Sequence, residues 1–265
     1  MRQKRTEKRS VYIIHEHLSP FLTKYRLTKK HHKQVLRPAG IFASVIIPVY
    51  NEAAVLEKSL ARLYASLDGG SVEVIVCDGG STDDSAQIAR RFPCQVVTSS
   101  PGRAQQMNTA SQLARGDWLL FLHADSALPM HWSDELAKAR HWGFFPVRLN
   151  GAHWFFRVIE TAINWRSRYS RVATGDQALF FRQSFFAALQ GFPAIPLMED
   201  VAISKKARHI CKPWIATNPV VTSSRRWEQN GIAKTIVLMW SLRFAYWLGI
   251  DPVRLHRIYY PKQQA

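Results

Sequence analysis

Short apolar runs alternate with stretches of helical spacing from about Ile41 onward, and this alternation restricts the folds that are open to the chain. Each run is rich in β-branched or aromatic residues and ends in polar ones, which is the pattern of a buried strand. The four runs are FASVIIPVY, VEVIVCDGG, CQVVTSS and DWLLFLHAD. Strands that are joined by helical crossovers run parallel in one sheet. We therefore predict an α/β fold with helices packed on its sheet.

The segments between the runs have the spacing of amphipathic helices, since leucines recur every three or four positions in NEAAVLEKSLARLYASL. Ligands of open parallel sheets bind beyond the carboxyl ends of the strands, where the connecting loops meet. These loops carry Asn51, Glu52, Asp78, His123 and Asp125. We expect them to line one acidic crevice.

Charge and hydropathy divide the 265 residues into three parts. The formal net charge is +17, and residues 1–40 contain 11 Lys or Arg against 2 Glu, so we expect a basic, flexible extension before a main domain at residues 41–231. We expect an amphipathic helical segment at residues 232–265. Its apolar stretch Ile232–Ile250 contains Arg243 and a lysine, which favours an interfacial or core helix over a membrane span.

The cellular location is inferred from the N-terminus and the cysteines. MRQKRTEKRS is not followed by the apolar core of a signal peptide, and the three cysteines lack CxxC spacing. Both features indicate a cytoplasmic protein with reduced thiols. The basic charge and the apolar C-terminal stretch suggest peripheral contact with the inner face of the cell membrane. No recognition motif supports nucleic-acid binding.

Asp125 and His123 end the run DWLLFLHAD, where the strand delivers both side chains to one point. Mg²⁺ and Mn²⁺ prefer oxygen ligands and commonly bind one or two protein carboxylates together with a nucleotide diphosphate. His123 lies on the same face and could ligate Mn²⁺ or bind the diphosphate. We predict a divalent metal site at this pair. The alternative is that Asp125 caps a helix that begins near Met130.

Four further acids lie in polar loops or at a helix start. Asp78 in CDGGSTDDS is placed to contact a nucleobase or ribose, or else belongs to a simple turn. Asp176 in TGDQ could hold sugar hydroxyls. Glu199 and Asp200 begin a helical stretch, where at most one of two neighbours faces the crevice and can act as a base. The alternative is an acid pair that caps the helix.

Two basic groups could bind phosphates. Gly102 and Arg103 open a helix that also carries Gln106, so helix amides and a guanidinium are available to anions. Arg226 and Trp227 in SSRRWEQNG could counter a leaving diphosphate or stack on a sugar. Surface charge is the alternative in both cases.

Taken in order, these motifs resemble those of the family 2 glycosyltransferases. They are SVIIPVYNE, VIVCDGGSTDDS, SSPGRAQQMNTA, GDWLLFLHADS, TGDQALFFR and MEDVAISKKAR, and they cover about residues 44–231. The chain is most similar to the short, single-domain bacterial subgroup with GRA-x-QMN and HAD motifs. The resemblance implies a GT-A fold, which is a Rossmann-like mixed sheet flanked by helices. It also implies a nucleoside-diphosphate sugar donor and inversion at the anomeric carbon.

The resemblance also assigns roles on the donor side. Pro48, Asn51, Glu52 and Asp78 would hold the nucleoside, and Arg103 would help with it or with the phosphates. These positions all follow or end the first strands of the sheet.

On the reaction side, the resemblance makes Asp125 the metal ligand, while His123 stands where the family usually has a first Asp. Asp200 would be the base that deprotonates the acceptor, with Glu199 as its neighbour. Arg226 and Trp227 resemble the family's RW element without its preceding Gln.

The sequence therefore predicts a metal-dependent, inverting glycosyltransferase that acts on a hydroxyl or carboxyl acceptor. The aromatic second half and the apolar C-terminal stretch suggest a lipidic acceptor of carotenoid or polyprenyl-linked type. A nucleotidyltransferase with a related core is one alternative, but it normally has a glycine-rich loop where this chain has NEAAV. A non-catalytic basic binding protein is the other.

Overall fold

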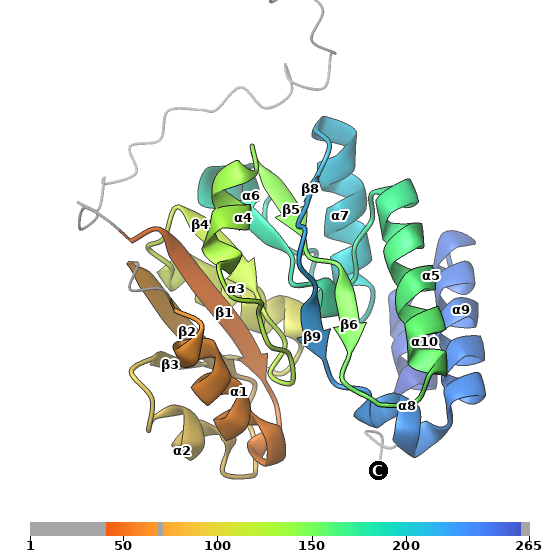
Figure 1. Ribbon diagram of the computed structural model, residues 1–265, viewed down its shortest axis with the longest axis horizontal. Helices are drawn as coiled ribbons and strands as arrows, with labels where there is room; N and C mark the ends of the chain where they lie inside the picture. The colour runs from red at the N-terminus through yellow and green to blue at the C-terminus, as the bar shows by residue number, and fades with distance from the viewer. Residues whose placement is uncertain (1–40, 68–70, 261–265) are drawn as a thin grey trace, which may run out of the picture. The chain divides into compact units, whose positions relative to one another are not determined.

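Seven strands form the main sheet of the computed structural model, which describes residues 41–67 and 71–260 (Figure 1). The predicted basic extension at residues 1–40 lies outside the described residues. The strands follow the order β3-β2-β1-β4-β7-β5-β8. Their bounds are β1 (Ala43–Val49), β2 (Val72–Asp78), β3 (Gln95–Thr98), β4 (Trp118–Phe121), β5 (Trp142–Phe144), β7 (Phe180–Arg182) and β8 (Trp214–Ile215).

The sheet is mixed, because β7 runs antiparallel to both β4 and β5 while the other neighbours are parallel. The four predicted apolar runs are β1 to β4, and the predicted α/β fold is confirmed.

Helices cover both faces of the main sheet. On one face lie α1 (Ala53–Ala65), α2 (Ser85–Ala89) and α4 (Trp132–Lys138); on the other lie α3 (Arg103–Leu113), α6 (Gln183–Ala188) and α7 (Glu199–Ile210). Successive residues of β1 point to opposite faces, so Val45 and Ile47 join the first layer and Ile46 joins the second. The fully buried strands thus read as continuous apolar runs.

A second unit of structure is built on a two-stranded parallel sheet. It comprises β6 (Val147–Leu149), β9 (Val220–Thr222), α5 (Phe155–Ser170), α8 (Arg225–Asn230), α9 (Ile232–Trp247) and α10 (Pro252–Tyr259). Helices α5 and α9 stand side by side in Figure 1. Phe156 and Ile159 of α5 belong to one apolar cluster with Ile232 and Ile236 of α9, which holds the two helices together.

Among the described residues, no helix has both the length and the apolar character that a bilayer span needs. Helix α9 belongs to the segment that was predicted to be amphipathic. Trp240, Phe244 and Trp247 are exposed while Leu242 is buried, so apolar side chains lie on both sides of the helix.

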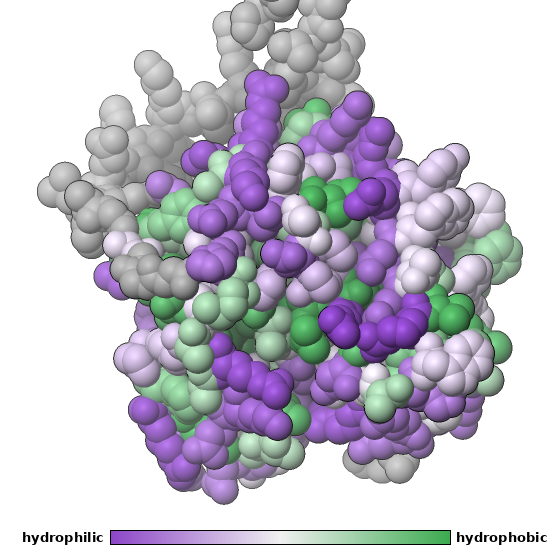
Figure 2. Space-filling model, in the orientation of Figure 1, coloured by the Kyte–Doolittle hydropathy of each residue, from purple (hydrophilic) through white to green (hydrophobic). Residues whose placement is uncertain are grey.

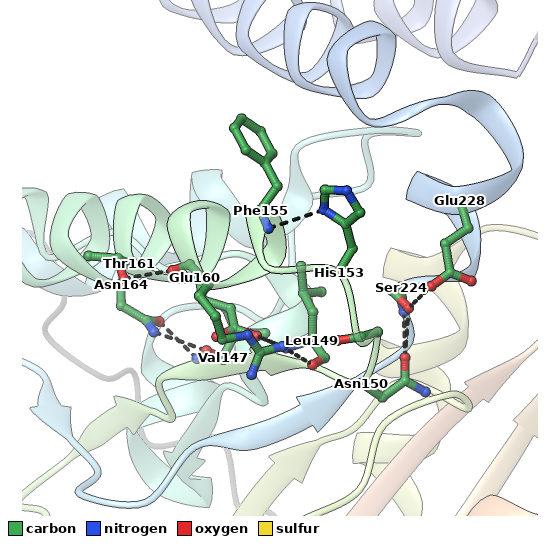
Figure 3. A network of polar contacts seen from close by, with 12 residues as sticks. Val147, Leu149, Asn150, His153, Phe155, Glu160, Thr161, Asn164, Ser224 and Glu228 are labelled. Carbon is green, nitrogen blue, oxygen red and sulfur yellow. Dashed lines mark hydrogen bonds and ion pairs between the residues drawn. The ribbon is translucent and has the colours of Figure 1, made fainter.

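Side chains of α5 satisfy the backbone of β6 along the edge that faces away from β9 (Figure 3). Asn164 donates from Nδ2 to the Val147 carbonyl at 2.9 Å and accepts the Val147 N–H at 2.8 Å. Glu160 accepts the Leu149 N–H at 2.5 Å, and the Arg157 guanidinium donates to the Leu149 carbonyl at 2.7 Å. An exposed strand edge is thereby closed by a helix, which fixes the position of α5.

Replacement of Asn164 by Ala should destabilise the fold, because both backbone groups of Val147 would lose their partners. We expect the free energy of unfolding to fall by about 1–3 kcal/mol in urea titrations. Thr161→Ala is the matched control: Thr161 is exposed on the same helix and donates only to the carbonyl of Arg157 in its own helix. Equal losses in the two variants would contradict this role of Asn164.

Candidate active site

The loops after β1 and β2 are clamped to one another. Asn51, which has a positive φ of 55°, donates its N–H to Ser81 Oγ at 2.9 Å, and its side-chain oxygen accepts the Thr82 N–H at 2.8 Å. Asp83 accepts the Ala53 N–H at 3.0 Å at the start of α1. The side chain of Asn51 therefore holds the loops in place, and its predicted contact with a nucleoside stays a prediction.

Two residues that were predicted to contact the nucleotide-sugar donor, Asp78 and Gln106, are buried near the ends of β1 and β2. The carboxylate of Asp78 is 5% exposed and accepts the N–H groups of Gly80 and Ser81 at 3.2 and 3.1 Å, so it shapes its own loop. Gln106 is 2% exposed and donates from Nε2 to the carbonyls of Val49 and Cys77 at 2.7 and 2.9 Å. The amide group of Gln106 thus bridges β1 and β2, and its predicted contact with the nucleotide sugar stays a prediction.

Pro48 is buried within β1, whereas Glu52 lies at the strand end and reaches across to α8. The carboxylate of Glu52 forms an ion pair with Arg225 at 3.3 Å. Burial raises the pKa of Glu52, and the positive charge of Arg225 partly offsets this rise. Glu52, which was predicted to hold the nucleoside of the donor, is thus joined to Arg225 of the basic helix α8.

The topology brings Asp125 and Asp176 to the same end of the sheet. Asp125 follows β4, and Asp176 lies in the short 3₁₀ turn η2 (Gly175–Gln177) that precedes β7. Because β4 and β7 are antiparallel neighbours, the end of one strand lies beside the start of the other. The charge of Asp176 contributes to raising the pKa of Asp125, although burial is the main cause.

Glu199 and Asp200 join these acids from the first turn of α7. Asp200 accepts the Gly175 N–H at 2.5 Å and the Val201 N–H at 2.6 Å. Glu199 is 4% exposed, and burial together with the charge of Asp200 raises its pKa to about 7. Burial also raises the pKa of Asp200. The pair is therefore held where proton transfer near neutral pH is accessible.

His123 lies against Gly175 and lines a small cavity together with Glu199 and Asp200. A Cβ atom on Gly175 would approach His123 Nε2 to 2.6 Å, so this close contact requires glycine. Burial and the nearby charges of Arg103 and Arg226 lower the pKa of His123 to about 3. The imidazole is neutral at physiological pH and can bind a cation or a polar ligand.

In the described part of the chain, no cluster of three or more His, Cys, Asp or Glu side chains is arranged to hold a metal ion. Asp125 and the neutral His123 are suitable ligands, but a cation bound there needs further oxygens. The diphosphate of a nucleotide is a ligand of that kind. Asp125 and His123 thus fit a metal that binds together with the nucleotide.

Cationic side chains close the site from α3 and α8. Arg103, which follows Gly102 (φ 125°) at the start of α3, lies near enough to Glu199 and Asp200 for their charges to raise the pKa of its guanidinium. Arg226 stacks over the ring of Tyr259 at 4.4 Å. These residues are where the sequence predicted an anion-binding group.

Trp227 packs, partly buried, against the apolar cluster that contains Phe156 and Ile159, so its ring supports α5. Its predicted stacking on a sugar stays a prediction. Ser224, just before α8, holds this segment: its N–H donates to Asn150 Oδ1 at 2.9 Å and its hydroxyl donates to Glu228 Oε1 at 2.7 Å (Figure 3).

The sequence patterns did not single out Arg166 of α5 and Arg243 of α9 as site residues. Asp176 and Asp200 both raise the pKa of each guanidinium, while burial lowers it. Both arginines therefore lie beside the acid cluster. An available signal was the position of Arg243 within an otherwise apolar stretch, which calls for a reason to keep a charge there.

Comparison with known proteins places this chain within a recognised family. The profile of the family described as "Glycosyl transferase family 2" matches residues 44–185. The glycosyltransferase AglD of Haloferax volcanii is 28% identical over 167 residues, which are 59% of this chain and 27% of AglD. The chain thus spans well under half the length of that curated relative.

Two solved structures are similar in fold. TarS of S. aureus in complex with UDP has a TM-score of 0.55 and 20% identity, over 69% of this chain and 60% of that one. The mannosyltransferase PcManGT from Pyrobaculum calidifontis in complex with GDP-Man and Mn²⁺ has a TM-score of 0.50 and 24% identity, over 68% and 56%. The mixed sheet with flanking helices is the GT-A arrangement.

Replacement of Glu199 by Gln should change how stability depends on pH. The folded state raises the pKa of Glu199 from 4.5 to about 7, so the wild-type protein loses stability as the pH rises through this range and the buried carboxyl ionises. Without divalent cations, we expect the stability of Glu199→Gln relative to wild type to increase by roughly 1–3 kcal/mol between about pH 5 and pH 8. Urea unfolding at several pH values measures this.

Glu57→Gln is the control for this experiment, since Glu57 is exposed on α1. It should show no such trend. A pH-independent difference between Glu199→Gln and wild type would rule out a raised pKa at Glu199.

Proposed function

This chain belongs to glycosyl transferase family 2, and on that basis we propose that it moves a sugar from a nucleoside-diphosphate sugar to a hydroxyl or carboxyl group of an acceptor. One observation carries the proposal. Asp125, which follows β4, and Asp200, which begins α7, converge at the carboxyl end of the sheet, where Arg103 couples electrostatically to both. This arrangement offers a metal ligand, a base and a cation around one crevice.

Asp200 acts as the base in this proposal. The acceptor oxygen attacks the anomeric carbon, its proton passes to Asp200, and the bond from the sugar to the diphosphate breaks, with inversion. The N–H groups of Gly175 and Val201 hold the carboxylate, and its raised pKa favours proton uptake. Glu199 supports Asp200 as a buried neighbour whose charge adjusts its proton affinity.

The donor is held by the loops after β1 and β2 and by the cations of the site. The backbone of residues 48–52 and 78–81 frames the nucleoside, while Arg103, Gly102 and Arg226 face the diphosphate. A divalent cation, Mn²⁺ or Mg²⁺, would be held by Asp125 and His123 and would stabilise the charge of the leaving diphosphate. PcManGT, which shares the fold, contains Mn²⁺ beside GDP-Man, and this supports the assignment.

Donor hydrolysis in water tests the proposed roles of the two acids. We expect slow release of nucleoside diphosphate from one of the UDP-, GDP- and dTDP-sugars, dependent on Mn²⁺ or Mg²⁺ and abolished by chelator. Asp125→Ala should lower this rate about 100-fold or more, because the metal loses its carboxylate, and Asp200→Asn should lower the same hydrolysis by about 10²–10⁴, because the attacking water loses its base.

Asp134→Asn, an exposed acid on α4, serves as the control and should behave as wild type. Turnover that persists in chelator, or in Asp125→Ala, would contradict the metal role. No turnover and no saturable binding of any donor by the folded protein would overturn the enzyme assignment.

A lipidic acceptor and peripheral membrane contact are supported by the outward faces of α5 and α9. Trp165 and Tyr169 of α5 are 69% and 80% exposed, and Trp240 and Trp247 of α9 are both 70% exposed. Pale and green surfaces gather along the right edge of Figure 2, where these helices lie. An apolar surface of this kind is costly in water and typical of an interaction site.

The occupant that fits this surface is an anionic bilayer. From Arg148 to Arg171, the stretch that contains α5, the chain has five arginines and one acid, Glu160, which is buried and paired with Arg157. From Gly231 to Tyr260 the chain has four Lys or Arg and one acid, Asp251. Tryptophans at a basic surface suit the interface of an acidic membrane.

Vesicle co-sedimentation tests this surface. We expect the whole chain to bind phosphatidylglycerol-rich vesicles, and the Trp240→Ala/Trp247→Ala variant to bind about tenfold less, because two exposed rings can no longer enter the interface. The comparison belongs at about 0.3 M salt, where screening reduces the contribution of residues 1–40. Leu113→Ala, at the end of α3, is the control. If the Trp240→Ala/Trp247→Ala variant loses no more binding than Leu113→Ala does, the assignment is wrong.

A further inference from the structure

Two arginines from neighbouring helices are held close together against their mutual repulsion. Burial and the charge of Arg243 lower the pKa of Arg166 to about 10, and Arg166 reaches Ser167 Oγ at 3.0 Å with Nη2. Arg243 has a lowered pKa, mainly because it is buried. Like charges in partly buried positions destabilise a fold unless something else compensates them.

Part of each guanidinium is also unsatisfied. The buried Nε of Arg166 and the buried Nη1 of Arg243 have no hydrogen-bond partner among the described residues. A buried charged N–H without an acceptor destabilises the folded state. Donors left open in this way are expected where a ligand supplies the oxygens.

The charges around the pair favour an anion. Lys205 and Arg208 of α7 add positive charge: burial is the main cause of the lowered pKa of Lys205, and the charges of Arg208 and Arg243 lower it further. The acids that face the pair are Asp176 and Asp200. Lys205 thus lies near Arg243 with Arg208 beside it, and of the two carboxylates the proposed function uses Asp200 as the base.

We propose that Arg166 and Arg243 bind a phosphate group of the acceptor, beside Asp200. Two guanidiniums can donate several charge-assisted hydrogen bonds to the tetrahedral oxygens of a phosphate, which matches their open N–H groups. The same two helices expose aromatic side chains on their outer faces, so an apolar chain attached to the phosphate would follow this surface outward. The acceptor is a phosphate-bearing lipid; this identification rests on the proposed glycosyl transfer.

Titration of the full chain with farnesyl monophosphate tests the site without any donor. We expect saturable binding, and a Kd that rises at least about tenfold in Arg166→Gln and in Arg243→Gln, as each loses charged hydrogen bonds. Arg243→Lys should bind with intermediate affinity, because it keeps the charge but loses the planar fork. Arg168→Gln is the control, since Arg168 is exposed on α5, and its Kd should stay within about twofold of wild type.

Farnesol and inorganic phosphate separate the two halves of the ligand. Both should bind much more weakly than farnesyl monophosphate. Farnesol binding as tightly as the monophosphate would overturn the phosphate site, and equal affinity for inorganic phosphate would overturn the lipid. Unchanged Kd values in both Gln variants, or no binding by wild type, would overturn the proposal as a whole.

Thermal unfolding guards against variants that fail to fold. The monophosphate should raise the Tm of wild type and of Arg168→Gln, because a ligand that binds the folded state stabilises it, and should not raise the Tm of either Gln variant. If a Gln variant is unfolded, the corresponding Arg→Lys variant supplies the comparison. Binding without any donor turnover would overturn the proposed function alone, and donor turnover without binding would overturn this inference alone.

Discussion

The crowding of acidic side chains at one end of the main sheet is the constraint on which the site depends. Asp125, Asp176, Glu199 and Asp200 come from three separate segments, and burial raises the pKa of Asp125, Glu199 and Asp200. Such a group of carboxylates holds together only if backbone N–H groups and cations oppose the repulsion. The N–H of Gly175 in η2 and the guanidinium of Arg103 at the start of α3 oppose this repulsion at the first turn of α7.

The two halves of the chain contribute differently to this site. In the first half, buried amide and carboxylate groups such as those of Gln106 and Asp78 fix the ends of β1 and β2, so the donor side is rigid. In the second half, α5 is fixed to β6 by Asn164, and α9 packs on α5. The antiparallel pairing of β4 with β7 joins the halves, since it places Asp176 beside Asp125.

The first half could be predicted from the sequence because buried parallel strands read as apolar runs and their ends carry the polar loops. The convergence of Asp125 and Asp200 also followed from the resemblance. The contacts of Gln106 and Trp227 did not follow from the sequence, because a motif does not tell which carbonyls an amide will meet or which apolar cluster a ring will join. Strands of two or three residues, such as β6 and β8, are too short to show a period, so the second half gave no topology.

Helices α5 and α9 carry two features that are unfavourable for an isolated chain in water. Their outer sides expose large aromatic rings, and their inner sides bury guanidinium nitrogens without partners. Each feature alone could be a local imperfection of packing, but a phosphate-bearing lipid bound at a membrane accounts for both: the bilayer covers the rings and the phosphate satisfies the arginines. Because Asp200 adjoins the same arginines, binding of that head group would also bring the acceptor to the base. Without a ligand these two helices are therefore less stable than better-satisfied helices would be, and the same groups that lower their stability recognise the acceptor.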